Sequence, residues 1–303
     1  MKRDLIYLLI IFAVVISACS EHIKMETENG PQLTGIFGMV TAENKNHTVK
    51  ITKTMPFYST DSAECVSGAS VVVYYDADGQ HVVQRYVETE KGLYESEAPF
   101  AGQHGVTYHL DVTTYGVSED ETQHFTAECL MMPNIDKIDS IRIGKYKLGE
   151  LEFKHRLGVY PYFQSLPDKN IYYMGRLMKN DTLLSDTITE CVVASMEGFS
   201  GMYFNGPQMA ALSGEIAAYY LDQRLQDEKL RDGDTVTLLI GTVTKKYANY
   251  ISDISSSSGS NPMMGMPSNV STNISPSDKA VGFFTAYSEV SFTDIYHEEE
   301  EEE

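Results

Sequence analysis

The chain has 303 residues, of which 42% are hydrophobic and 22% are charged, and its formal net charge is −20 at pH 7. A surface this acidic repels nucleic acid and anionic lipid, so the composition argues against electrostatic binding to either. Twenty tyrosines without any tryptophan favour strands, because tyrosine suits a half-buried pleated surface.

The first 18 residues have the pattern of a bacterial lipoprotein signal. Lys2 and Arg3 give a basic start, residues 5–16 an apolar core, and Ser17-Ala18 the small residues that precede cleavage. The apolar core is short for a membrane span and ends at Cys19. We therefore expect Cys19 to become the lipid-bearing first residue of the mature chain. The alternative is an ordinary secretory signal followed by a chance cysteine.

Residues 19–32 predict a tether, since they are polar and include Gly30-Pro31. From residue 33 onward, short β-branched or aromatic runs recur with alternating polarity, as in half-buried strands. These runs are residues 33–40, 47–52, 69–75, 81–87, 107–113 and 123–127. Asp76 to Gly79 supplies turn residues. We predict an immunoglobulin-like or transthyretin-like antiparallel β-sandwich over residues 33–132.

Pro133-Asn134 breaks this pattern and predicts a domain boundary. Strand-like runs then resume at residues 138–143, 170–177, 187–193, 235–241, 281–287 and 290–292. They predict a second β-rich domain over residues 133–293, with one or two short helices. Residues 294–303 end in six glutamates, Glu298 to Glu303, and predict an acidic disordered tail.

For residues 207–231, the sequence does not decide between a helix and a strand. A helical stripe joins Met209, Leu212, Ile216 and Tyr220, and residues 224–231 suit a helix by propensity. Gly214 weighs against a helix, and residues 216–221 also fit a strand. Residues 244–254 predict a short helix with Tyr247, Tyr250, Ile251 and Ile254 on one side.

The cysteines beyond Cys19 are Cys65, Cys129 and Cys191, an odd number in a compartment that permits disulfides. We expect at most one bridge, between Cys65 and Cys129. The spacing of the three residues matches no zinc or redox motif.

The sequence predicts no catalytic residue, metal site or cofactor. His104 and His109 straddle a turn at Gly105, which disfavours a metal pair. Asp76 to Gly79 lacks the further ligands of a calcium loop. No nucleophile elbow, zinc-protease helix motif or phosphate-binding loop is present.

Two groups of residues are candidate binding elements. Met263, Met264 and Met266 lie in a Ser/Gly-rich loop over residues 255–267, and mobile methionines suit docking to an adaptable apolar partner. Simple packing and Cu(I) binding by sulfur are the alternatives. Tyr160, Tyr162 and Phe163 form the second group. These aromatic side chains would bind a small ligand if exposed, and would otherwise belong to the core.

Several segments together resemble the DUF4249 family of Bacteroidetes envelope lipoproteins. They are SGASVVVYYDADGQ (67–80), KGLYES (91–96), GVTYHLDV (105–112), MMPNIDKIDSI (131–141), NIYYMGRL (170–177), DGDTVTLLIGTVTKKYANYI (232–251) and NPMMGMPSNVSTNI...GFFTAYS (261–288). The resemblance covers nearly the whole mature chain and favours a strand over residues 216–221. It implies an accessory role beside TonB-dependent outer-membrane transporters, and it transfers no catalytic residue.

We therefore predict a non-enzymatic lipoprotein held at the cell envelope, expected at the outer membrane, by a lipid on Cys19. It would assist, or capture a small ligand for, an outer-membrane transporter. The alternatives are a surface adhesive or structural protein, and a hydrolase whose site is dispersed over loops. No nucleic-acid partner is expected.

Overall fold

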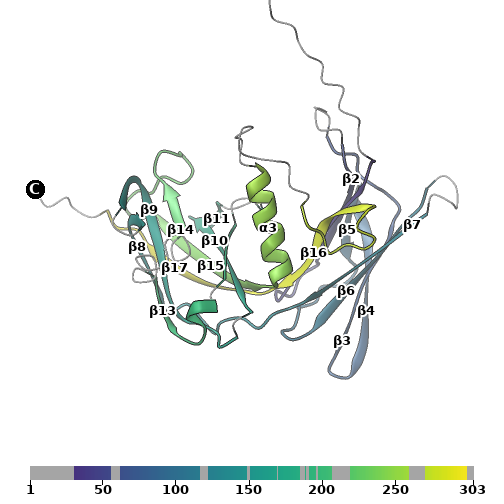
Figure 1. Ribbon diagram of the computed structural model, residues 1–303, viewed down its shortest axis with the longest axis horizontal. Coiled ribbons are helices and arrows are strands. Elements are labelled where there is room, and N and C mark those ends of the chain that lie inside the picture. The colour runs from purple at the N-terminus through teal and green to yellow at the C-terminus, as the bar shows by residue number, and fades with distance from the viewer. Residues whose placement is uncertain are drawn as a thin grey trace, which may run out of the picture. The chain divides into compact units, whose positions relative to one another are not determined.

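The computed structural model describes residues 31–55, 62–116, 122–148, 151–168, 170–184, 188, 191–195, 197–206, 219–258 and 270–298. Apart from Pro31, these residues belong to one compact unit. Their structure is mainly β, as predicted, and helical segments include α3 (Lys245–Ser258) and the short 3-10 helix η3 (Glu197–Phe199) (Figure 1).

The first sheet has eight strands in the order β16-β1-β2-β5-β4-β3-β6-β7. Its strands are β1 (Thr34–Thr41), β2 (Thr48–Lys53), β3 (Ser70–Ala77), β4 (Gln80–Glu90), β5 (Leu93–Ser96), β6 (Thr107–Thr114), β7 (Gln123–Leu130) and β16 (Ala280–Tyr287). All neighbouring strands are antiparallel except β1 and β16, which are parallel. In Figure 1 the yellow β16 therefore belongs with the purple and blue strands from the other end of the chain.

Alternating polarity explains how these strands bury one face. In β3, Val71 and Val73 are buried, whereas Val72 between them is only half-buried. On β4, the inward-facing Val82 packs against the core while Val83 is 49% exposed. The alternating polarity predicted for residues 69–75 and 81–87 is thus confirmed around Val72 and Val82.

The sheet curls until its edge strands β7 and β16 meet. The backbone N–H of Ala286 in β16 donates to the Cys129 Sγ of β7 at 3.2 Å. The amide of Asn273 donates to the carbonyl oxygens of Glu128 in β7 and Phe284 in β16, at 3.1 and 2.8 Å. The expected sandwich over residues 33–132 therefore receives its eighth strand from residues 280–287, far along the chain.

Two further sheets enclose a second core. One has the order β11-β10-β15-β17, with β12 also paired to β10, and the other has the order β13-β9-β14, with β8 also paired to β9. The strands are β8 (Ser140–Leu148), β9 (Leu151–Gln164), β10 (Tyr172–Lys179), β11 (Thr182–Leu183), β12 (Val192–Ser195), β13 (Tyr203–Asn205), β14 (Tyr219–Asp222), β15 (Thr235–Val243) and β17 (Glu289–Ile295). Buried residues of both sheets form one hydrophobic cluster.

The segment from Ala280 to Ile295 belongs to both halves of the fold. Its first part is β16 of the eight-stranded sheet, Ser288 is the junction, and its second part is β17, which pairs with β15. Because β17 continues to Ile295, the expected tail from residue 294 begins two residues too early. The described part of the tail after the strand is residues 296–298.

Helix α3 confirms the helix predicted over residues 244–254 and extends it to Ser258. Its buried side includes Tyr250 and Ile251, as predicted, together with Ala248. Around it lies a third cluster with Met174 of β10 and Tyr287 of β16. The helix thus packs against strands of both the first and the second core.

The ambiguous segment contains β14 at Tyr219–Asp222, which confirms the strand for the described part of residues 216–221. Residues 207–218 lie outside the described residues. A helix over 224–231 is wrong: residues 223–228 form turns. The reason is local, because Gln223 accepts from the backbone N–H of Leu230 at 2.9 Å and Glu228 accepts from that of Asp222 at 2.6 Å. These side chains compete with helical hydrogen bonds for the backbone, and among the described residues 224–231 a single i→i−4 bond forms, from the Lys229 N–H to the Leu225 carbonyl oxygen at 2.9 Å.

Candidate functional site

A cleft of about 280 Å³ lies between the β10–β12 edge of one sheet and β14 of the other. Its lining comprises Gly175, Arg176, Leu177, Leu184, Cys191, Val192, Tyr219, Tyr220, Leu221 and Glu228. Most of these residues are apolar or aromatic, and a few polar groups stand among them. Such a composition is typical of sites for small molecules.

Gly175 allows the wall of this cleft to form. A Cβ atom on Gly175 would lie 1.8 Å from the ring of Tyr219, which is far closer than two carbon atoms can approach. The missing side chain lets the Tyr219 ring pack directly on the β10 backbone. Burial raises the pKa of the Tyr219 hydroxyl well above its ordinary value, so this group stays neutral.

The Arg176 guanidinium is neutralised by Glu289 of β17. Its Nε donates to Glu289 Oε1 at 2.9 Å, and its Nη2 donates to Oε2. Burial alone would lower the pKa of Arg176, but the hydrogen bonds and charge of Glu289 raise it above its usual range. The side chains are only 21% and 15% exposed, so this bidentate pair is a fixed part of the structure.

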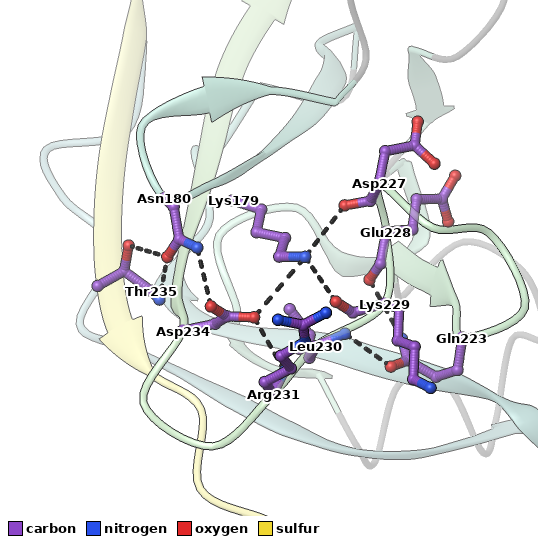
Figure 2. A network of polar contacts seen from close by, with 10 residues as sticks. All are labelled: Lys179, Asn180, Gln223, Asp227, Glu228, Lys229, Leu230, Arg231, Asp234 and Thr235. Carbon is purple, nitrogen blue, oxygen red and sulfur yellow. Dashed lines mark hydrogen bonds and ion pairs between the residues drawn. The ribbon is translucent and has the colours of Figure 1, made fainter.

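A polar network holds the loop between β14 and β15 that brings Glu228 to the cleft (Figure 2). The Lys179 ammonium donates to the carbonyl oxygens of Asp227 and Lys229 at 3.3 and 2.5 Å. It also lies 3.7 Å from a carboxylate oxygen of Asp234. The lysine side chain is only 16% exposed, which identifies it as a structural cation for this loop.

Asn180 completes this network from the β10–β11 turn. Its side-chain nitrogen donates to Asp234 at 2.8 Å, and its side-chain oxygen accepts from the Thr235 backbone N–H at 2.9 Å. Asn180 has a φ of 47° and Asp181 a φ of 62°, a left-handed pair that suits a two-residue hairpin turn. The turn thus positions both Asn180 and Lys179 against the loop.

The expected ligand aromatics belong largely to the core. Tyr160 is 6% exposed, and its hydroxyl donates to the Lys145 carbonyl oxygen at 3.0 Å. Phe163 is 2% exposed and stacks on Phe204 at 4.9 Å between ring centres. Tyr162, between them, is half-buried. The prediction that all three form a ligand surface is wrong, because Tyr160 and Phe163 are both buried in the hydrophobic cluster of the second core.

The expected Cys65–Cys129 disulfide is also wrong, since both residues are free thiols. Cys65 forms an isolated bridge with Thr52 of β2, whereas Cys129 contacts β16. Cys65 lies on the side of β2 away from β1, so the path from β7 through β16, β1 and β2 to Cys65 has four strand intervals, or about 19 Å along the sheet. A disulfide requires Cα atoms within about 7 Å.

His104 and His109 contact different partners. The His104 ring contacts the Ser288 hydroxyl at 2.7 Å, and His109 stacks on Tyr74 at 5.0 Å between ring centres. Across the described residues, no group of three or more His, Cys, Asp or Glu side chains is arranged to hold a metal ion. Within the same residues, no helix is long and apolar enough to cross a membrane.

Two sets of predicted residues cannot be placed. Cys19 and the methionines at 263, 264 and 266 lie outside the described residues. Conversely, sequence reasoning did not single out Gly175, Tyr219 or Glu228. A glycine within the strand run at 170–177 was the available signal, because such a glycine often marks close approach of another group.

The fold and cleft thus define a mainly β protein with three hydrophobic clusters and a small cleft between two of its sheets. Comparison with protein families finds the domain of unknown function DUF4249 over residues 20–293. The chain belongs to this family. No curated protein matches it.

Proposed function

We propose that this chain is a non-enzymatic, lipid-anchored protein of the cell envelope that captures a small ligand for an outer-membrane transporter. The observation that supports capture is the cleft between β10, β12 and β14. Its volume of about 280 Å³ is near the lower end of small-molecule sites, which run from about 300 to 1,000 Å³. The export segment that ends at Cys19 supports the anchor.

The chemistry of the cleft favours a compact ligand with an apolar body. Leu177, Leu184 and Val192 contribute aliphatic surface, and Tyr219 contributes a buried ring. The Arg176 charge is already paired with Glu289, so the carboxylate of Glu228, which accepts from the Asp222 backbone N–H at 2.6 Å, is the remaining charge in the lining. An uncharged or weakly polar molecule fits these surroundings best.

Filling the cleft tests the capture step. Leu184 lines it and is half-buried, so Leu184→Trp should occupy its space. Leu151→Trp is the matched control, because Leu151 is 65% exposed and outside the cleft lining. Small molecules that co-purify with the protein would be extracted and identified by mass spectrometry. We expect a ligand with the wild type and the control that is lost with Leu184→Trp; equal recovery from all three would refute the site.

The anchor and the partner need separate tests. Cys19→Ala should abolish labelling by an alkyne fatty acid, and undiminished labelling would rule out lipid on Cys19. Partner capture is tested by purification from native envelopes in mild detergent. Replacement of Met263, Met264 and Met266 with serine should weaken recovery of the transporter without changing the melting temperature or copper dependence. Unchanged recovery would remove this loop as the docking element.

A further inference from the structure

The hydroxyl group of Tyr219 borders the cleft without a hydrogen-bond partner in the protein. Tyr219 begins β14, lines the cleft and is 9% exposed. Among the described residues its hydroxyl forms no hydrogen bond, and burial is the only cause that raises its pKa. A buried hydroxyl without a partner costs free energy, and native proteins rarely leave one in this state. This group therefore calls for a partner from outside the chain.

Neighbouring tyrosines of the same core use their hydroxyl groups to bind the backbone. The Tyr160 hydroxyl donates to the Lys145 carbonyl oxygen at 3.0 Å. The Tyr173 hydroxyl accepts from the Leu166 backbone N–H at 2.9 Å. Both residues belong to the hydrophobic cluster that contains Tyr219, and neither lines the cleft. Tyr219 thus departs from the pattern of its cluster, and it does so at the border of the cleft.

The Tyr219 hydroxyl oxygen is open to the cleft rather than sealed in the core. In the described part of the chain, the side-chain oxygens that are both sealed from solvent and without a partner are those of Thr41, Tyr86 and Thr285. The Tyr219 oxygen is not one of them, although it also lacks a partner. It therefore keeps accessible surface, and the cleft is the space that its side chain lines.

Close packing fixes the position of this hydroxyl. A Cβ atom on Gly175 would overlap both the ring and the hydroxyl oxygen of Tyr219. The phenol thus rests directly on the backbone of β10, and it cannot swing toward another partner without losing this contact. A group that is already held in place loses little conformational entropy when a ligand binds to it.

The chemistry of the lining specifies an uncharged acceptor. Burial keeps the Tyr219 hydroxyl protonated by raising its pKa, so it offers an O–H donor. The Glu228 carboxylate lies in the same lining, and the Arg176 charge is paired with Glu289, so an anionic acceptor is disfavoured. A carbonyl, ether or hydroxyl oxygen accepts a hydrogen bond without bringing a charge into the cleft.

We propose that Tyr219 is the specificity-determining residue of the cleft and that its hydroxyl donates a hydrogen bond to an uncharged oxygen of the ligand. The ligand class is a compact, largely apolar molecule with such an oxygen, for example a ketone, an ether or an alcohol. A hydrocarbon of the same shape binds more weakly, because it leaves the hydroxyl unpaired. This inference rests on the proposed capture function and makes its ligand more specific.

Reversible thiol tethering tests this preference, because Cys191 lines the cleft. The probes are two aryl disulfides on the same series of short tethers. One carries a methyl ketone, and the other carries the isosteric isopropenyl group, in which CH₂ replaces the oxygen. Both compete for the full chain in the presence of a reducing thiol, and peptide mapping by mass spectrometry gives the ratio of adducts at each cysteine.

Cys65, which is half-buried and outside the cleft lining, gives the intrinsic ratio of the two fragments. Relative to Cys65, we expect the ketone to exceed the alkene at Cys191 by about fivefold or more.

Two tyrosine variants assign the preference to one hydroxyl. Tyr219→Phe removes the hydroxyl and keeps the ring, so the ratio of adducts at Cys191 should fall to the ratio at Cys65. Tyr173→Phe is the matched control, because it removes a buried hydroxyl from the same cluster but outside the cleft lining. The ketone preference should persist in this control. A preference that survives Tyr219→Phe would overturn the proposal.

Thermal stability separates a ligand-binding hydroxyl from a structural one. Tyr173→Phe removes the acceptor of the Leu166 N–H and should lower the melting temperature. Tyr219→Phe breaks no hydrogen bond among the described residues and should leave the melting temperature of the ligand-free protein unchanged, or raise it. Equal decreases in the two variants would show that the Tyr219 hydroxyl has a structural role and would contradict the proposal.

The tethering result also distinguishes this inference from the proposed function. Equal adducts of the two fragments at Cys191 of the wild type would show that the cleft admits ligands by shape alone. That outcome overturns the role of Tyr219 and leaves ligand capture standing. No adduct of either fragment at Cys191, with normal modification of Cys65, would show that the cleft admits no ligand, and it would overturn both.

Discussion

The side-chain amide of Asn134 donates to the carbonyl oxygen of Ser288 at 3.0 Å, and also to that of Ile240 at 3.2 Å. Ser288 is the residue between β16 and β17, where the chain leaves the first sheet and enters the second. Asn134 follows the first seven strands directly. One side chain thus connects the start of the second half to the strand that both halves share.

Replacement of Asn134 with alanine should destabilise the whole protein. The change removes both donors and leaves two carbonyl oxygens without this partner, which costs about 1–3 kcal/mol. Chemical denaturation should show a lower free energy of unfolding with a single transition. Asn273→Ala, which removes donors between β7 and β16, is a useful comparison. A change below about 0.5 kcal/mol for Asn134→Ala would contradict the role assigned to this residue.

The parallel pairing of β1 with β16 depends on Gly282. This glycine has a φ of 102°, and a Cβ atom there would lie 2.1 Å from the Ile36 carbonyl oxygen. Gly282→Ala should therefore cost at least about 3 kcal/mol, from backbone strain and a clash with the neighbouring strand. Gly68→Ala is the matched control, since its φ is 72° and nothing lies within 4 Å. Similar losses for the two variants, measured by denaturation, would show that the clash has no consequence.

Local sequence patterns predicted most strands and helix α3 because alternation and helical spacing are properties of adjacent residues. The parallel β1–β16 pair joins residues that are 246 positions apart, and no local pattern encodes such a pairing. The cleft was missed for a similar reason: Gly175 and Tyr219 meet only after two separate sheets pack. Tyr160 and Phe163 were candidates because aromatic residues have the same composition signal in a core as in a binding surface.

The Arg176–Glu289 pair should contribute strongly to stability once formed. Glu289→Gln leaves a largely buried guanidinium without its charged partner, which costs about 3–5 kcal/mol when a buried pair is broken. Glu152→Gln is the control, because its exposed pairs with two lysines are worth about 0–1 kcal/mol. Denaturation curves should separate the two variants clearly. Equal effects would mean that solvent screens the Arg176–Glu289 pair as well.

The thiols of Cys65 and Cys129 should react at very different rates. Cys65 is half-buried, whereas Cys129 is 5% exposed and burial raises the pKa of its thiol. A thiol-specific reagent should therefore modify Cys65 in the folded protein and Cys129 only on unfolding. Peptide mapping after a short exposure measures both. A reducing agent should leave the melting temperature unchanged, and a marked decrease would indicate a bridge that involves one of these residues.

His47 should make the protein less stable in mild acid. It is 2% exposed, and its Nε2 donates to the Phe100 carbonyl oxygen at 2.9 Å. Burial, with a smaller effect of Lys45, lowers its pKa below the ordinary value, despite the opposing effects of the Phe100 hydrogen bond and the Glu43 charge. The unfolded chain then takes up the proton first, near pH 6.5. The stability contributed by neutral His47 is complete above that pH and is lost as the pH falls toward the folded pKa.

His47→Gln should remove this pH dependence, because glutamine keeps an N–H donor and does not titrate. The free energy of unfolding would be measured between pH 7.5 and pH 5 for the wild type and for the variant. His81→Gln is the matched control, since the His81 side chain is 59% exposed and pairs with Asp76 at the surface. We expect a flatter profile for His47→Gln and an almost unchanged one for His81→Gln. A wild-type slope in His47→Gln would assign the acid sensitivity to other groups.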